Sequence, residues 1–231
     1  MSIKRLMLWI AILLMLCSMA PAVQAEEPAP TLLYMGQASI RIVTAEGKVI
    51  YIDPYAGDWY DLPADLILVT HGHFDHNDLD KVTLRNEGCQ IITHKEAVVN
   101  GEHQTFDLGY VKVEAVEAGY NRLHDVRECA GYVLTFSNGR SVYVTGDTSA
   151  TEQMKAMADM HIDYAFWCTD GVYNMGPEEA AQCAEWVQAN HNIPYHNDAS
   201  NSGLMFDEEK ARQFGAPNLL VVLPGEEIRI E

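Results

Sequence analysis

The sequence predicts an α+β fold built from two β-rich halves, each of which carries helices. Short apolar runs of strand length occur in both halves, and each half contains a hairpin turn signal, Ala45-Glu46-Gly47 and Ser137-Asn138-Gly139-Arg140. A clear amphipathic helical pattern follows the second hairpin at 177–190. No repeat or linker interrupts the chain after residue 30, and 48% of the residues are hydrophobic. We therefore expect residues 26–231 to form one domain.

The N-terminus has the features of a secretory signal peptide. Lys4-Arg5 precedes an apolar run at 6–16, and small residues follow from Ala20 to Ala25. We expect cleavage after Ala25, so that residues 1–25 are the signal peptide and the protein is exported to a periplasm or to the extracellular medium. The alternatives are an uncleaved N-terminal anchor and a lipoprotein modified at Cys17.

The charge balance excludes some partners. Removal of residues 1–25 takes away two basic residues and no acidic ones, so the net charge changes from −18 to −20. Such a charge repels nucleic acid and anionic membrane surfaces. We expect a small-molecule substrate, no nucleic acid and no stable membrane association after signal cleavage. The oligomeric state is not indicated by the sequence.

Four cysteines follow the signal peptide, and none of them forms a CxxC pair. An exported chain meets an oxidising compartment, so one or two disulfides and buried free thiols are both compatible with the sequence. These cysteines are Cys89, Cys129, Cys168 and Cys183.

The first half is predicted to contain five strands and two short helices. The strands are apolar or alternating runs bounded by turn residues, and the first helix is predicted because Asn77-Asp78 can cap it. The predicted strands are 31–34, 39–43, 48–52, 66–69 and 90–93, and the predicted helices are 77–85 and 95–100.

The second half is predicted to contain eight strands and three helices. The helix at 177–190 is supported by Pro177 near its first position and by Glu178 and Glu179 in its first turn. The other predicted helices are 149–160 and 207–214, and the predicted strands are 105–108, 111–116, 131–136, 141–144, 164–167, 193–195, 219–223 and 228–230.

The most informative stretch is Thr70–Asn77, which directly follows the strand at 66–69. It contains His71-x-His73-x-Asp75-His76. His71 and His73 share one side of an extended segment, whereas Asp75 and His76 lie past the bend and can reach a second ion. Imidazole nitrogens with one carboxylate suit zinc, or else iron or manganese. The alternative is a histidine-rich surface loop.

Two further residues at strand ends have the chemistry of metal ligands. Asp147 follows the strand at 141–144 through Gly146, and a carboxylate there can bridge two ions. Its alternative role is to cap the helix that follows. His196 ends the strand-like run at 193–195, where the alternative is an ordinary loop histidine.

With these residues placed, the chain resembles the metallo-β-lactamase-fold hydrolases. The family's HxHxDH signature corresponds to His71, His73, Asp75 and His76, and its Gly-Asp-Thr motif corresponds to Gly146-Asp147-Thr148. Within the family the chain is most similar to the compact ascorbate-6-phosphate lactonase-like group. The resemblance covers 31–231 and implies a four-layer αββα sandwich with the metals at one edge. Further cues are Ile52-Asp53-Pro54, Ala118-Gly119-Tyr120-Asn121, Gly176-Pro177-Glu178-Glu179-Ala180 and Ile193-Pro194-Tyr195-His196.

The resemblance implies two divalent metal ions, for which Zn²⁺ is expected and Fe or Mn is the alternative. One ion would take His71, His73 and a residue from the loop at 117–128. We prefer His124 there because imidazole is the better donor, with Asn121 as the alternative. The remaining ligands are implied to be Asp75, His76 and His196 on the other ion, with Asp147 bridging the two.

The implied activity is hydrolysis of a small ester, lactone or phosphodiester by a metal-bound hydroxide. Asp75 is the candidate catalytic residue, since it can orient the nucleophile or shuttle its proton. Asp53 either hydrogen-bonds a ligating imidazole or is only a turn residue before Pro54, and Tyr173 and Asn121 are candidates for substrate binding. Asp147 argues against a true β-lactamase, because the antibiotic-degrading branches of the family have cysteine or serine near this position. The alternative function is a non-catalytic exported metal-binding protein, a buffer or sensor.

Overall fold

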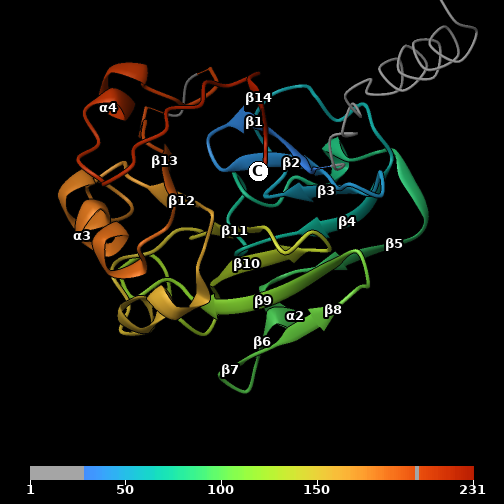
Figure 1. The fold of residues 1–231 in the computed structure, drawn as a ribbon, viewed down its shortest axis with the longest axis horizontal. Coiled ribbons are helices and arrows are strands. Elements are labelled where there is room, and N and C mark those ends of the chain that lie inside the picture. The colour runs from blue at the N-terminus through green and yellow to red at the C-terminus, as the bar shows by residue number, and fades with distance from the viewer. Residues whose placement is uncertain (1–28, 201–202) are drawn as a thin grey trace, which may run out of the picture.

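The computed structural model describes residues 29–200 and 203–231. The predicted signal peptide at 1–25 lies outside the described residues. Two six-stranded sheets, each containing parallel and antiparallel pairs, stack face to face in the described part of the chain (Figure 1). The predicted α+β class and the two-sheet sandwich are therefore confirmed.

The first sheet has the strand order β14-β1-β2-β3-β4-β5. Its β3–β4 and β4–β5 pairs are parallel, and its other pairs are antiparallel. The strands are β1 (Thr31–Gly36), β2 (Ser39–Val43), β3 (Val49–Ile52), β4 (Ala64–Leu68), β5 (Arg85–Ile92) and β14 (Glu227–Arg229).

The second sheet has the order β13-β12-β11-β10-β9-β8, with β11, β12 and β13 parallel to one another. A separate hairpin of β6 (Val98–Val99) and β7 (Glu102–His103) was not predicted. The strands of the second sheet are β8 (Thr105–Asp107), β9 (Val111–Glu117), β10 (Ala130–Phe136), β11 (Ser141–Val144), β12 (Tyr164–Cys168) and β13 (His191–Tyr195).

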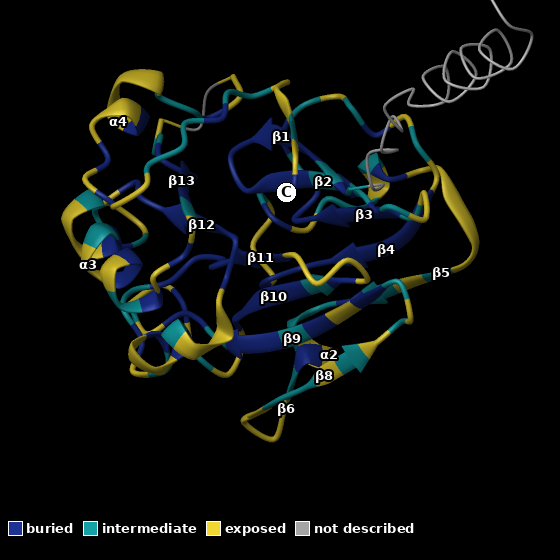
Figure 2. Cartoon of the chain, viewed as in Figure 1, coloured by how far each residue is buried: buried dark blue, intermediate teal, exposed yellow. Residues whose placement is uncertain are grey.

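Alternation along the strands divides their side chains between two hydrophobic clusters. In β1, Leu32 and Tyr34 belong to the main core, whereas Leu33 and Met35 belong to a cluster on the opposite face of the first sheet. The central strands β3, β4, β10, β11 and β12 are buried along all or almost all of their length (Figure 2). This continuous core holds the two sheets in one fixed arrangement.

Helical elements cover the outer faces unequally. The helix α3 (Pro177–Val187) packs against the 3₁₀ helix η2 (Gln153–Met160) and β12. Its buried residues are Ala180, Cys183, Ala184 and Val187, which is the spacing of one helical face. The first sheet is covered by the short 3₁₀ helix η1 (Leu79–Lys81) and neighbouring loop residues. The remaining helices are α2 (His94–Ala97) and α4 (Glu208–Arg212).

The predicted helices at 77–85 and 149–160 differ most from the structure, the first in extent and the second in type. The helix expected at 77–85 is reduced to η1, because Asp78 makes no side-chain cap and Arg85 already pairs with Ala64 of β4. The helix expected at 149–160 is the 3₁₀ helix η2 and begins later. Its first residues are held elsewhere: the Ser149 N–H donates to the Gly119 carbonyl and the Ala150 N–H to the Glu179 carboxylate.

The strand expected at 219–223 is also wrong. This segment makes only one bridge, between Leu219 and Asn192 of β13, and then leaves the sheet before the turn at Pro224-Gly225. The helix at 95–100 is shorter than predicted, since the chain turns into β6 after Ala97.

The described residues include four cysteines and no disulfide. All four described cysteines are free, and three of them are buried. Across residues 29–200 and 203–231, no helix combines the length and apolarity that crossing a lipid bilayer requires.

Candidate metal centre

The seven predicted metal ligands lie together at one edge of the sandwich. His71 follows β4, Asp147 follows β11 and His196 follows β13, so the carboxyl ends of parallel strands from both sheets meet there. Three groups of donor atoms are close enough to share an ion: His71, His73 and His124; His71, His76 and Asp147; and Asp75, His76 and His196. The structure thus brings together every residue predicted to bind metal, and it divides them much as the sequence suggested.

The Asp53 carboxylate organises the histidine-rich stretch. Asp53 ends β3 with a φ of 45° and is completely buried. Its Oδ1 atom accepts the Thr70 N–H at 2.7 Å, and its Oδ2 atom accepts the Thr70 hydroxyl at 2.7 Å and lies 2.8 Å from His76 Nδ1. The prediction that Asp53 hydrogen-bonds an imidazole of the cluster is confirmed, with His76 Nδ1 as the donor.

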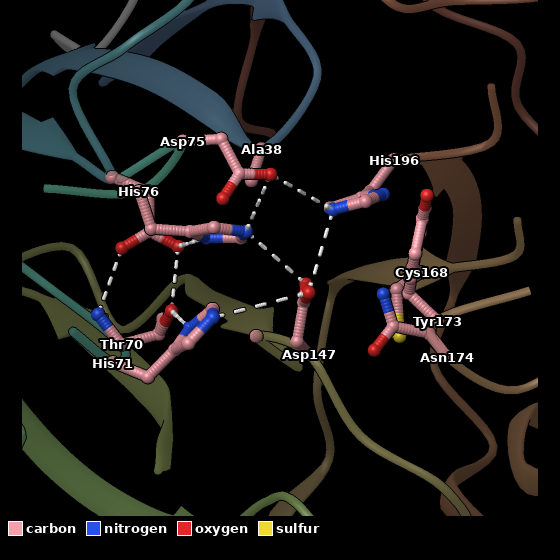
Figure 3. A network of polar contacts seen from close by, with 12 residues as sticks. Ala38, Thr70, His71, Asp75, His76, Asp147, Cys168, Tyr173, Asn174 and His196 are labelled. Atoms are coloured by element: carbon pink, nitrogen blue, oxygen red, sulfur yellow. Dashed lines mark hydrogen bonds and ion pairs between the residues drawn. The ribbon is translucent and has the colours of Figure 1, made fainter. Parts of the chain in front are cut away.

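Asp147 occupies the centre of the cluster, as Figure 3 shows. Its Oδ2 atom lies 3.3 Å from His124 Nε2, 3.4 Å from His196 Nε2 and 3.9 Å from His71 Nε2. Its Oδ1 atom lies 3.4 Å from His76 Nε2. One carboxylate therefore faces imidazoles from both predicted ligand groups.

Gly146 allows this placement of Asp147. Its φ of +64° favours glycine, and a Cβ atom would lie 3.0 Å from Thr70 Cβ and 3.1 Å from the Ala130 carbonyl oxygen. The absence of a side chain lets the end of β11 approach the end of β4 closely. Asp147 is thereby brought next to His71.

The loop at 119–124 places His124, and not Asn121, among the donors. Asn121 Oδ1 accepts the backbone N–H of Leu123 at 2.9 Å and of His124 at 3.1 Å, and it lies 3.0 Å from His124 Nδ1. Gly119, with a φ of +91°, has no room for a Cβ atom because the His124 carbonyl oxygen would lie 2.9 Å away. The Asn121 side chain therefore orients His124, and it does not line the cavity at the cluster.

His196 is held by contacts to both sheets. Its backbone N–H donates to the Gln37 carbonyl at 2.9 Å, and its own carbonyl accepts the Thr169 N–H at 3.2 Å. Its Nδ1 atom lies 3.4 Å from Asp170 Oδ2. A φ of 41° turns the chain at this residue, so the imidazole points toward Asp147.

A common pattern fixes how the imidazoles face. In four of the histidines, Nδ1 lies near an oxygen atom, which leaves Nε2 directed toward Asp147. For His71 that oxygen belongs to the Thr70 hydroxyl, which already donates its proton to Asp53 and so accepts the Nδ1 proton. The four oxygens are Thr70 Oγ1, Asp53 Oδ2, Asn121 Oδ1 and Asp170 Oδ2, at 3.1, 2.8, 3.0 and 3.4 Å respectively.

Several inward-facing atoms are buried and without a hydrogen bond to the described residues. They are Nε2 of His71, of His124 and of His196, and Oδ1 of Asp147. Buried polar atoms are rarely left without partners, since desolvation of each is unfavourable. Nitrogen and oxygen donors in this state fit divalent metal ions.

The electrostatics of His71 and Asp147 agree with this donor role, whereas the metal-free cluster favours a protonated His76, which must lose the proton on Nε2 when it binds an ion. Burial, together with the neighbouring His76, holds the pKa of His71 well below its usual value, so His71 is neutral. Burial would raise the pKa of Asp147, but His196 and His76 outweigh it and hold that pKa well below the usual range. Burial would lower the pKa of His76, but Asp147 and Asp53 outweigh it and hold that pKa well above the usual value.

The structure adds residues that the sequence reasoning did not single out. The Gln37 side-chain amide, in the β1–β2 turn, donates to Asp75 Oδ2 at 2.9 Å and lies 3.2 Å from His76 Nε2. Asp170 follows β12, so the strand-end argument used for Asp147 could have found it. Gln37 could not have been found in this way, because it lies in the turn between two apolar strands and its burial is visible only in the structure.

A cavity of about 330 Å³ opens onto the cluster. Tyr173, a predicted substrate contact, lies in its wall. The lining residues are His73, Phe74, Asp75, Leu123, His124, Asp147, Tyr173 and His196.

Residues 31–196 match the family model described as a beta-lactamase superfamily domain. A UPF0173 metal-dependent hydrolase from Geobacillus sp. (strain WCH70) is 32% identical over 191 residues, covering 71% of this chain and 83% of that protein. The segment matched by the family model runs from β1 to His196 and so contains every predicted ligand.

Solved structures have the same fold. A candidate metal-dependent hydrolase from Parabacteroides distasonis is similar with a TM-score of 0.66 and 27% identity, covering 83% of this chain and 92% of that chain. A candidate zinc-dependent hydrolase of the metallo-β-lactamase superfamily from Thermotoga maritima is similar with a TM-score of 0.56 and 22% identity, covering 81% of this chain and 87% of that chain.

Proposed function

This chain belongs to the beta-lactamase superfamily and is a metal-dependent hydrolase of the UPF0173 family, and from this premise we propose that it uses two divalent ions to hydrolyse a small carboxylic ester or lactone. Zn²⁺ is the expected metal, because the donors are mostly imidazole nitrogens and the similar Thermotoga maritima protein is described as zinc-dependent. The lactone alternative follows the similarity of the motifs to the ascorbate-6-phosphate lactonase-like group.

The observation that carries the proposal is the orientation of the imidazoles. In His71, His76 and His124 the Nδ1 atom is hydrogen-bonded to an oxygen atom, and in His196 it lies 3.4 Å from Asp170 Oδ2, so that Nε2 of each imidazole is left on the side that faces Asp147. His71, His73 and His124 would hold one ion, Asp75, His76 and His196 the other, and Asp147 would bridge them. A single-ion site would leave one of these donor groups buried without a partner.

Two ions so held would polarise the scissile carbonyl and lower the pKa of a water molecule between them. Asp75 is the residue that we propose to take the proton of that water, because it lines the cavity and is partly exposed. The Gln37 amide donates to Asp75 Oδ2 and so fixes the orientation of this carboxylate.

The cavity favours a carbonyl substrate over a phosphodiester. Among the described residues, no lysine or arginine lines it, so a phosphate would meet no cationic side chain beside the metals. The net charge of −18 adds a long-range repulsion for anionic substrates.

The test is to purify residues 26–231, to count bound metals by elemental analysis, and to assay lactones, carboxylic esters and phosphodiesters. We expect two ions per chain and turnover of esters or lactones that His73→Ala abolishes. The exposed His161 provides the control variant His161→Asn, which should keep both metals and full turnover. Tight metal binding without turnover of any compound would contradict the proposal and favour the buffer or sensor function.

The cellular location is proposed from the sequence alone. Lys4-Arg5, the apolar run at 6–16 and the small residues up to Ala25 support export to a periplasm or to the medium. Mass spectrometry of the protein from fractionated cells should give a chain that begins at Glu26 in the exported fraction. A full-length chain in the membrane fraction would instead support an uncleaved anchor.

A further inference from the structure

Three exposed apolar side chains form a rim around the mouth of the cavity at the metal centre. Phe74, Leu123 and Tyr173 line that cavity and are 70%, 43% and 39% exposed. Single exposed apolar residues are common on protein surfaces, but three that converge on one catalytic cavity indicate a binding surface.

The rim is held in place by the same residues that orient the metal ligands. The Leu123 N–H donates to Asn121 Oδ1 at 2.9 Å, and the Tyr173 N–H donates to Asp170 Oδ1 at 2.6 Å. The ring of Phe74 packs edge-on against Tyr55, with ring centroids 5.7 Å apart. These contacts fix the positions of the three rim residues, and their apolar surface stays exposed to solvent.

The polar side chains that line the cavity are all proposed to bind the metal ions. His73, Asp75, His124, Asp147 and His196 are the proposed metal ligands, which leaves only the rim to contact the part of a substrate away from the reacting carbonyl. The neighbouring cation Arg122 is exposed and does not line the cavity. The rim thus offers apolar contact and no charge that would bind an anionic group.

We infer that the rim formed by Phe74, Leu123 and Tyr173 binds an uncharged hydrocarbon acyl group, so that the substrates are neutral esters or lactones with an apolar acyl chain. This inference rests on the proposed ester or lactone hydrolysis. In the reaction, water oxygen bonds to the acyl carbon and the bond from that carbon to the alcohol oxygen breaks. The alcohol oxygen takes one proton from the water, and the acid product releases the other.

The test uses the metal-loaded protein and p-nitrophenyl esters from acetate to octanoate. We expect kcat/KM to rise about twofold to fourfold per added methylene until the rim is filled, the upper value corresponding to full burial of each methylene. Binding of alkyl hydroxamates of the same chain lengths, measured by calorimetry without turnover, should strengthen in the same ratio. Phe74→Ala and Leu123→Ala should flatten both series while the metal content stays unchanged.

Two matched variants separate the alternatives. Leu84 is 46% exposed and does not line the cavity, so Leu84→Ala should leave the chain-length dependence intact. Arg122→Ala should also leave it intact. Equal kcat/KM for all chain lengths would overturn the inference while leaving ester hydrolysis standing, whereas absence of turnover with every ester would overturn the proposed function itself. A selective loss in Arg122→Ala toward esters with an anionic acyl group would overturn the inference in favour of an anionic substrate.

Discussion

The Nδ1 atom of His76 lies 2.8 Å from the Oδ2 atom of Asp53, and both side chains are completely buried. The same Oδ2 atom accepts the Thr70 hydroxyl, while Oδ1 accepts the Thr70 N–H. The Thr70 N–H, the Thr70 hydroxyl and the His76 imidazole thus all donate to one carboxylate. His76 must therefore carry a proton on Nδ1, which leaves Nε2 as the atom that can bind a metal.

Asp53→Asn should weaken metal binding without changing the fold. An asparagine amide in place of Oδ2 would face two donors, and relief of that conflict would favour the His76 tautomer that carries its proton on Nε2. We expect the affinity for the ion bound by His76 to fall about 10-fold to 100-fold, measured by competition with a fluorescent chelator.

Asp159→Asn is the control for this change, because Asp159 is an exposed carboxylate on η2. It removes the same charge and should leave the affinity unchanged. Equal affinity in both variants would mean that Asp53 acts only as a turn residue.

The stability of the metal-free protein should depend on pH through His76. Its pKa is held well above the usual value, because the attraction of Asp147 and Asp53 outweighs burial. A raised folded-state pKa gives a stabilising contribution that is complete below the unfolded value of about 6.5 and is lost as the pH rises through the folded value. In the presence of EDTA, His76→Gln should thus reduce the free energy of unfolding more at pH 6 than at pH 9.

Urea unfolding at both pH values gives the comparison. His161→Asn, a change at an exposed histidine outside the cluster, is the control and should change the free energy of unfolding little. A loss in His76→Gln that grows with pH would contradict the assignment of a protonated His76 in the metal-free state.

The four thiols that follow the predicted signal peptide should react slowly in the native protein. Burial raises the pKa of Cys129 and of Cys183 to about 12 and holds that of Cys168 well above its usual value, so little thiolate forms at pH 8. Cys89 is only half-buried and should react first. Iodoacetamide labelling followed by mass spectrometry should find four free thiols in denaturant without reductant. A smaller number would reveal a disulfide.

The strand-end residues could be predicted because a residue type that binds metals directly follows an apolar run of strand length at each of these positions. Asp147 and His196 each follow an apolar run, and the ends of parallel strands meet at one edge, so their convergence with His71 needed no side-chain detail. The α3 helix could also be predicted, because its buried residues recur three or four positions apart, as on one face of an α-helix.

The residues that orient the ligands could not be predicted in the same way. Gln37 contacts Asp75 and His76 from a different hairpin, and this contact depends on a turn with a φ of 46° at Gln37. The predicted helix at 77–85 failed for a related reason: pairing of Arg85 with Ala64 is a contact between distant residues that overrides the local capping pattern.

His124 and Asn121 should differ sharply in their effect on metal content. Nε2 of His124 is buried, faces Asp147 Oδ2 at 3.3 Å and lies within reach of His71 and His73, whereas Asn121 contacts only the far side of the same imidazole. His124→Ala should therefore remove one of the two ions at micromolar free metal. Asn121→Ala should retain both ions and weaken one of them by about 10-fold, as loss of an orienting hydrogen bond does. Elemental analysis after gel filtration and a chelator titration measure the two effects. The opposite order, with metal lost from Asn121→Ala and kept by His124→Ala, would assign the ligand to Asn121 and leave the buried Nε2 of His124 without a function.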